Sequence, residues 1–339
     1  MTSILIVVLN WNGIDDTEVC VASLLKQSYK NYQILIIDNG SVDDSVSRIK
    51  NIVKQNPKKI TFLQNKVNLG FAGGVNTGIK YAIKQGFDAV ALFNNDATAD
   101  VNWLASLEKN LHGSTRIVTG LLLHDDNKTI DSTGDFYSTW GIAFPRNRNQ
   151  PIKKAPASGL VFSGSGGASL YSLSLFKEIG FFDETFFAYY EDIDISFRTQ
   201  LAGYCVFYTK DAIAYHKQGA TSKKIPGFTV QHTFKNLPLL FWKNVPTKLL
   251  IPVGSRFILL YTLILANAIK NGSGWHALKG FGASIWFFWT KSLWQRLSIQ
   301  KNKKVTSKYI WQQLYHDIPP DQTGMRKFRA FFTNTKKGL

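Results

Sequence analysis

The chain has 339 residues, of which 45% are apolar and 19% are charged, a composition that excludes the collagen-like and intrinsically disordered classes. Its net charge of +17 lies at one end: residues 1–216 carry 20 Lys and Arg against 21 Asp and Glu, whereas residues 217–339 carry 20 against 2. Because the length exceeds a single core of about 100 to 200 residues, we expect a folded domain followed by a basic segment that faces an anionic partner.

The two cysteines, Cys20 and Cys205, are far apart and lack the spacing of a metal site. The sequence therefore supports neither a disulfide framework nor a thiolate zinc site, and two buried thiols in a reducing compartment are expected. The chain begins directly with a strand-like run and lacks the basic region and cleavage site of a secretory signal. We expect it to stay in the cytoplasm.

Short β-branched runs alternate with helix-like segments through the first hundred residues. The expected strands are Ile4–Leu9, Gln33–Asp38, Ile60–Gln64 and Ala89–Phe93, and the expected helices are Thr17–Gln27, Val42–Gln55 and Gly73–Gln85. This alternation predicts an α/β fold, with a mostly parallel sheet and helices on both faces. Ligands of such sheets bind beyond the carboxyl ends of the strands. Polar side chains follow the strands at these ends: Asn10, Asp38, Asn68, Asn94 and Asp96.

The later part of the chain is less regular. Residues 119–156 show no clear period, and a Gly/Ser-rich turn follows at Ser163–Gly167. Aromatic and acidic residues at 181–198 lead into a predicted helix, and a strand-like run covers Tyr204–Tyr215.

From about residue 225 the chain becomes apolar and aromatic, with prolines that are expected to break its segments. The most apolar stretch, Phe257–Ile269, would span only about 20 Å as a helix, short of the roughly 30 Å hydrocarbon core, so a simple transmembrane span is disfavoured. Residues Trp275–Trp294 mix four Trp with Lys, which is typical of helices that lie in the membrane interface. The sequence predicts a helical segment that lies on an anionic membrane surface.

The first cluster of residues suited to binding or catalysis is Leu92–Asp96, an apolar strand that ends in Asn94, Asn95 and Asp96. Such oxygen-bearing side chains bind hard cations, and a cation that neutralises a nucleotide diphosphate makes it a better leaving group. The same pattern is also typical of a strand-ending Asx turn.

The second cluster places Glu191, Asp192 and Asp194 directly after an aromatic run. Acids at the start of a helix are stabilised by the helix dipole, and Asp194 with Arg198 makes an i, i+4 pair, so capping explains part of the pattern. Capping does not explain the aromatic residues. A carboxylate among them would have its pKa raised by desolvation, which suits a general base, and both interpretations stay open.

Two further features are weaker evidence for a functional site. A single histidine is usually structural, but His216 follows a predicted strand end, which makes it a candidate metal ligand. The glycine-rich residues 68–78 are able to bring backbone amides close to phosphate oxygens. They match neither the G-x-G-x-x-G fingerprint nor a P-loop, so nicotinamide and ATP sites lose support.

Taken together and in this order, these elements resemble glycosyltransferase family 2, whose members are inverting enzymes of the GT-A fold, and most of all its bacterial rhamnosyltransferase-like members. The matching residues are Val7–Gly13, Ile36–Asp43, Asn68–Gly74, Leu92–Asp96, Phe181–Glu184 and Tyr190–Asp192. The resemblance implies a GT-A catalytic domain over residues 1–225, with a nucleotide-binding half at about 1–118 and an acceptor half at about 119–225. Residues 226–339 would form a helical membrane-docking region.

The resemblance also implies roles for single residues. Asp96 matches the last acid of the D-x-D motif that binds Mg²⁺ or Mn²⁺, although Asn94 replaces the first acid and leaves the metal fewer anionic ligands. His216 would add a ligand, and Asp192 matches the catalytic base, with Glu191 as its rival. The residues expected to bind or shape the site of the nucleotide sugar are Asn10, Asp38, Asp43, Asn68, Gly70, Asn76, Asn94, Asn95, Ser165, Gly166 and Gly167.

The implied function is transfer of rhamnose from dTDP-rhamnose to a lipid-linked or polysaccharide acceptor, at the cytoplasmic face of the membrane. An alternative within the class uses a UDP-hexose or another activated sugar. The non-enzyme alternatives are a basic nucleic-acid-binding protein and a non-catalytic scaffold. The apolar, Trp-rich tail speaks against nucleic acid, and the intact set of Asp96, Asp192 and His216 speaks against a scaffold. The sequence leaves the oligomeric state open.

Overall fold

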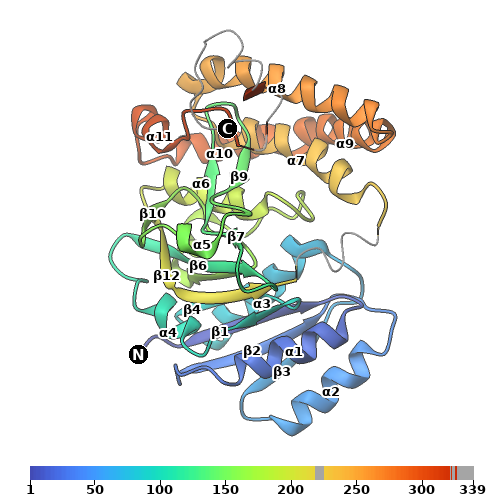
Figure 1. The fold of residues 1–339 in the computed structure, drawn as a ribbon, viewed down its shortest axis with the longest axis vertical. Helices are drawn as coiled ribbons and strands as arrows, with labels where there is room; N and C mark the ends of the chain where they lie inside the picture. Colours follow the sequence, from blue (N-terminus) through green and yellow to red (C-terminus); the bar gives the residue numbers. More distant parts are fainter. Residues whose placement is uncertain (218–224, 321, 323–324, 327–339) are drawn as a thin grey trace.

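The computed structural model describes residues 1–217, 225–320, 322, 325 and 326 (Figure 1). The expected domain boundary near residue 225 adjoins residues 218–224, which lie outside this part, as does most of the chain after residue 320.

A mixed sheet forms the centre of the molecule, with the strand order β10-β12-β6-β11-β4-β1-β2-β3. Strands β3, β2, β1 and β4 run parallel, β11 is antiparallel to both β4 and β6, and β6 is parallel to β12. The strands are β1 Ile4–Asn10, β2 Tyr32–Asp38, β3 Ile60–Gln64, β4 Ala89–Asn94, β6 Thr115–His124, β10 Gly159–Val161, β11 Ala168–Ser172 and β12 Cys205–His216. The short strands β5 Ala97–Ala99 and β7 Ile130–Ser132 pair with β12 and β6.

The strand register brings the predicted polar residues to one edge of the sheet. Asn10 lies opposite Asp38, and Leu9 lies opposite Asn94. Because these strands are parallel, their carboxyl ends open toward the same space.

Helices cover both faces of the sheet. Side chains alternate along β1, so that Ile4, Ile6 and Val8 pack under one layer of helices while Leu5 and Val7 pack under the other. The first layer contains α1 Ile14–Leu24, α2 Ser45–Gln55 and α4 Trp103–Glu108, and the second contains α3 Gly70–Gln85, α5 Leu173–Ile179 and α6 Glu191–Leu201. The predicted α/β class is confirmed, although the first and third predicted helices begin three residues earlier than expected.

A layer of helices lies at one end of the sheet domain (Figure 1), where the hairpin of β8 Asp135–Tyr137 and β9 Ala143–Pro145 extends to meet it. Pro238 lies inside α7 without ending it, contrary to the expected break. The helices are α7 Phe228–Asn244, α8 Leu250–Lys270, α9 Gly274–Phe287, α10 Leu293–Lys301 and α11 Ser307–Gln313, with short helical turns at Ile152–Lys154, Thr247–Leu249 and Phe288–Ser292.

The helix α8 is longer than the apolar segment expected from the sequence. It has 21 residues, about 31 Å at 1.5 Å per residue, because its first turn tolerates Pro252 and the helix begins at Leu250 rather than Phe257. Residues Thr247–Lys270 have a mean hydropathy of 2.0 and are long and apolar enough to cross a membrane by length and composition. The argument from length against a span was therefore wrong.

The basic surplus of the tail is also not wholly on the surface. Lys235, Lys243 and Arg296 are buried, and Arg296 donates to backbone carbonyls of residues in and just after α7. The expectation that the surplus faces an anionic partner was wrong for these three side chains. Lys235 and Lys243 bind carbonyls and acids of the sheet domain, and Arg296 binds carbonyls in and just after α7.

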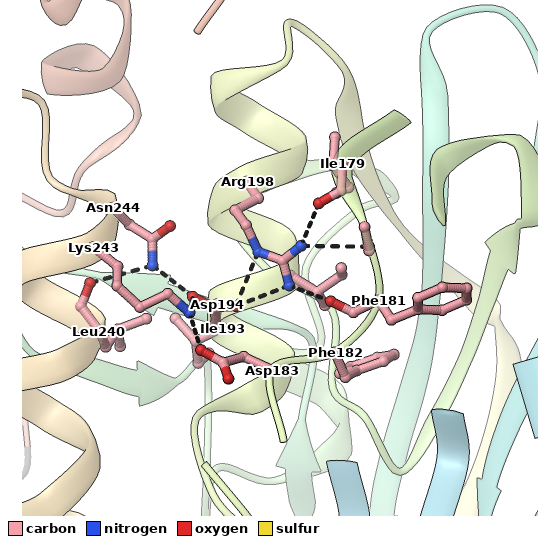
Figure 2. Close-up of polar contacts among 12 residues, drawn as sticks. Ile179, Phe181, Phe182, Asp183, Ile193, Asp194, Arg198, Leu240, Lys243 and Asn244 are labelled. Carbon is pink, nitrogen blue, oxygen red and sulfur yellow. Dashed lines mark hydrogen bonds and ion pairs between the residues drawn. The ribbon is translucent and has the colours of Figure 1, made fainter. Parts of the chain in front are cut away.

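Figure 2 shows the buried ion-pair network that joins α6 to α7. The Lys243 ammonium lies 2.5 Å from an Asp183 oxygen and 2.9 Å from an Asp194 oxygen, and Asn244 donates to the same Asp194 oxygen at 2.8 Å. Arg198 pairs with the other Asp194 oxygen at 2.9 Å. Removing one partner from such a network leaves a buried charge uncompensated, so α7 is held firmly against the sheet domain.

Candidate active site

A cavity of about 840 Å³ opens at the carboxyl edge of the central strands. Its wall is formed by the ends of β1 and β4, the turn at residues 165–167, residues 187–193 and the first turns of α7. Of the predicted site residues, those that line it are Asn68, Gly70, Asn94, Asn95, Asp96, Ser165, Gly166, Gly167, Glu191, Asp192 and His216.

Four predicted residues do not line the cavity. Asn10 and Asp38 are fully buried and bonded to each other at 3.0 Å, which fixes the ends of β1 and β2. Asn76 exchanges two hydrogen bonds with the backbone of Phe182, and Asp43 is exposed and caps the start of α2. The structure gives these four supporting roles, and direct contact with a nucleotide stays a prediction for them.

The side of the cavity nearest β2 is organised by Asn39, which sequence reasoning missed. Its amide donates to the side chain of Asn68 at 3.0 Å and to the carbonyl of Gly70 at 3.1 Å, while its oxygen accepts from Asn65. Asn39 directly follows Asp38 at the strand end, so its position could have indicated this role. The network holds Asn68 and Gly70 at the cavity wall.

The predicted metal ligands lie together. His216 Nε2 is 3.1 Å from Asp96 Oδ1, and His216 Nδ1 is 2.8 Å from Asp131 Oδ2. The amide of Asn94 is 3.4 Å from the same Nε2. Although burial lowers the pKa of His216, its contacts with the two carboxylates raise that pKa to about 9.

This donor set fits a hard cation only in part. Asp96 supplies a carboxylate and His216 supplies a nitrogen that Asp131 orients from behind, whereas the Asn94 amide presents its nitrogen to His216. Within the described residues no group of three or more His, Cys, Asp or Glu side chains is placed to hold a metal. Diphosphate oxygens and water would have to complete the coordination shell, as they commonly do for Mg²⁺.

Asp192 lies at the start of α6 and faces the cavity. Its Oδ2 accepts from the backbone N–H of Gly166 at 2.9 Å and its Oδ1 from that of Ile193 at 2.8 Å. A Cβ at position 166 would lie 3.3 Å from the Asp192 Cβ, so glycine there permits a close approach of the turn. Burial raises the pKa of Asp192, while the backbone N–H groups favour its charged form.

Glu191 is buried beside Asp192 but differs from it in its pKa and its hydrogen bonds. Burial and the neighbouring Asp192 charge raise the pKa of Glu191 to about 8. Its Oε2 has no hydrogen-bond partner in the part of the chain that the structure describes. The two backbone N–H groups that favour a charged Asp192 have no counterpart at this buried Glu191 oxygen, so the contacts favour Asp192 over Glu191 as a base.

The match to known proteins decides the family. Residues 3–180 match the family model described as glycosyl transferase family 2. The chain belongs to this family. It is a glycosyltransferase that uses a nucleotide-sugar donor.

Two bacterial relatives share about a quarter of the aligned residues with this chain. An N-acetylglucosaminyl-diphospho-decaprenol L-rhamnosyltransferase of Mycobacterium tuberculosis is 26% identical over 252 residues, which is 66% of this chain and 79% of that protein. A poly-beta-1,6-N-acetyl-D-glucosamine synthase of Staphylococcus aureus is 26% identical over 210 residues, 60% of this chain and 47% of that protein. The resemblance to rhamnosyltransferase-like members is confirmed.

Solved structures share the GT-A fold. The mannosyltransferase PcManGT from Pyrobaculum calidifontis, in complex with GDP-Man and Mn²⁺, aligns with a TM-score of 0.55 at 16% identity, over 92% of this chain and 88% of that one. GalNAc-T7 with UDP, GalNAc and Mn²⁺ aligns with a TM-score of 0.54 at 14% identity, over 72% and 51%. At these identities the likeness shows the fold alone.

The glycosyltransferase site contains further charged residues that no sequence motif indicated. Asp135 is buried, lines the cavity, and has its pKa raised to about 8 by burial and by the charge of Asp192. Arg148 also lines the cavity and pairs with Asp131 at 2.8 Å. All three lie in the region between residues 119 and 156, where the sequence shows neither periodicity nor a familiar motif.

Proposed function

We propose that this glycosyltransferase transfers rhamnose from dTDP-rhamnose, with inversion, to a lipid-linked or polysaccharide acceptor during synthesis of a cell-surface glycan. The observation that carries the proposal is the position of Asp192, which faces a cavity shared by the strand ends and α7. The relative from Mycobacterium tuberculosis named as an L-rhamnosyltransferase supports the choice of sugar. A UDP-hexose or another activated sugar is the alternative donor.

In this proposal Asp192 removes the proton of the acceptor hydroxyl as that oxygen attacks the anomeric carbon. The new C–O bond forms opposite the breaking bond to the diphosphate, so the configuration inverts. Gly166 and Ile193 hold the carboxylate in place through their backbone N–H groups. Asp96 and His216 would hold a divalent cation, which neutralises charge on the leaving diphosphate.

We further propose that the helical layer docks on the cytoplasmic face of an anionic membrane. Large apolar side chains are exposed on α8, α9 and the segment that follows, and Lys279 and Lys291 lie over neighbouring aromatic rings. This apolar face consists of Ile251, Ile258, Leu259, Leu263, Trp275, Trp286, Trp289 and Trp294. Burial of apolar area contributes about 25 cal/mol per Å², and each basic residue near anionic lipid about 1 kcal/mol.

The donor is tested by thermal denaturation of the full chain against a panel of nucleotide sugars, with and without Mn²⁺ or Mg²⁺. A ligand that binds only the folded state raises its stability by mass action, so the donor should produce the largest shift. We expect dTDP-rhamnose with a divalent cation to stand out. A larger shift with a UDP-hexose would select the alternative donor.

Docking is tested by co-sedimentation with vesicles that contain anionic lipid, at low and high salt. Screening weakens only the electrostatic part, so high salt should reduce binding and leave a remainder. Lys279→Glu with Lys291→Glu should weaken binding, whereas Lys58→Glu in the exposed turn between α2 and β3 should not. If the protein stays in the supernatant at low salt, the membrane proposal is wrong and the apolar face is better explained as an oligomer interface.

A further inference from the structure

The loop directly before Asp192 has an unusual backbone. Within residues 186–190, Phe187, Tyr189 and Tyr190 have φ values of 63°, 69° and 70°. Residues other than glycine rarely adopt this left-handed backbone region, so contacts with other parts of the protein must hold the loop in its conformation.

The helix α7 supplies those contacts from behind the loop. The fully buried amide of Asn236 donates to the carbonyls of Phe186, Ala188 and Tyr189 at 3.0, 2.9 and 2.8 Å. The ammonium of its neighbour Lys235 donates to the carbonyls of Thr185 and Phe186 at 2.7 and 3.1 Å. Two adjacent residues of one helix therefore bind the carbonyls of four of the five residues 185–189, and the carbonyl of Phe186 twice. We call this set of hydrogen bonds the α7 clamp.

The clamped loop touches both halves of the site. At one side the carbonyl of Phe187 accepts from the N–H of Ala72 at 3.2 Å, near the start of α3. At its end Tyr190 is the N-cap of α6, and its carbonyl accepts from the backbone N–H of Asp194 at 2.9 Å. A shift of the loop would move the wall beside Gly70 and the carboxylate of Asp192 together.

We propose that Asn236, assisted by Lys235, is a positioning residue for this glycosyltransferase. It holds residues 186–190 in their left-handed conformation and so sets the position of Asp192 relative to the bound donor. The inference rests on the role proposed above for Asp192 as the base, but its structural part, that α7 holds the loop, can be tested without any sugar.

The first experiment compares Asn236→Ala with Asn110→Ala, which removes the same side chain from the end of α4, where it also donates to a backbone carbonyl. Hydrogen exchange is followed in a peptide covering residues 185–192, and kcat and KM are measured with dTDP-rhamnose. We expect exchange of this peptide to accelerate about tenfold or more, and kcat to fall roughly 10- to 100-fold with little change in donor KM, only in Asn236→Ala. Unchanged exchange in Asn236→Ala would overturn the proposal.

The second experiment tests whether backbone conformation is what the clamp controls. Tyr189→Gly and Tyr189→Ala both remove the side chain, but only glycine adopts positive φ at little cost. The loss of kcat and of exchange protection caused by Asn236→Ala should therefore be several-fold smaller when residue 189 is Gly than when it is Ala. Equal losses in the two backgrounds would overturn the proposal.

A third variant covers the case in which Asn236→Ala does not fold. Lys235→Met keeps the aliphatic stem and removes only the donation to Thr185 and Phe186, so the same comparison with residue 189 can be made in a milder background. If exchange responds as expected but no donor is turned over by the wild type, the proposed function fails while the clamp stands. If transfer occurs and Lys235→Met leaves both exchange and kcat unchanged, the clamp fails instead.

Discussion

The cavity has two sides that are built by different means. On the sheet side, polar side chains such as Asn39 and Asp96 follow strand ends and act close to where they stand in the chain. On the helical side, Lys235, Asn236 and Lys243 reach about fifty residues back along the chain to hold the backbone and acids of residues 183–194. The helical layer therefore forms part of the cavity wall. Removing the chain after about residue 221 would remove α7 and with it one side of the cavity.

The largest effect is expected on the chemistry itself, where the two sides meet. Asp192→Asn should lower kcat by about 10²- to 10⁴-fold while donor binding persists, because the base acts on the acceptor and not on the nucleotide. Steady-state rates and thermal shifts with the donor measure both quantities. If Asp192→Asn keeps near-normal turnover while Glu191→Gln loses it, the base is Glu191.

The next largest effect is expected on stability from the helical side. Lys243→Met removes the cation between Asp183 and Asp194 and should destabilise the protein by about 3–5 kcal/mol, because it leaves buried acids without their partner. Chemical denaturation measures this change. Lys279→Met, which removes an ammonium from the apolar face, is the control and should change stability by less than about 1 kcal/mol. Equal stability of the two variants would show that α7 is not anchored through Lys243.

A smaller effect is expected on the sheet side from the metal ligands. Asp96→Ala should weaken cation-dependent donor binding about tenfold or more, and His216→Ala should do so more mildly. Titration of the thermal shift with Mn²⁺ at fixed nucleotide sugar gives the affinity. Full activity of the wild type in excess EDTA would contradict a role for the cation.

The smallest effect concerns pH. Since the folded protein raises the pKa of Glu191 from 4.5 to about 8, the native state binds its proton more tightly than the unfolded chain does. Glu191 therefore makes stability fall as pH rises between these values. Glu191→Gln should gain stability relative to wild type as pH rises from 5 to 8, as followed by urea denaturation. A variant of Glu108, at the end of α4, serves as control, and parallel curves for Glu191→Gln and wild type would contradict the expectation.

Much of the sheet side could be predicted from the sequence, because alternating strands and helices fix which residues reach the carboxyl edge. Asp96 and His216 line the cavity at this edge, and their predicted roles stay predictions. The helical side could not be predicted. Lys235 and Lys243 look like surface charges in a basic tail, and nothing local shows that their partners are carbonyls and acids far away in the chain.

Two other features were not predicted from the sequence, for different reasons. Asp135 and Arg148 lie in a region without a hydrophobic period, where only the tertiary fold brings side chains to the cavity. The length of α8 was underestimated because Pro252 was taken to break the helix, whereas proline is tolerated in a first turn.

Gly70 has a consequence for any attempt to redesign donor specificity. It adopts a φ of 70°, and a Cβ there would lie 2.4 Å from the carbonyl of Phe187. Even an alanine at this position would press on residues 186–190, which lead into Asp192. We therefore expect a library that varies Gly70 to lose turnover whatever sugar it favours. The adjacent Phe71 also lines the cavity, is half-buried and has no positive φ, so it is the better position to diversify.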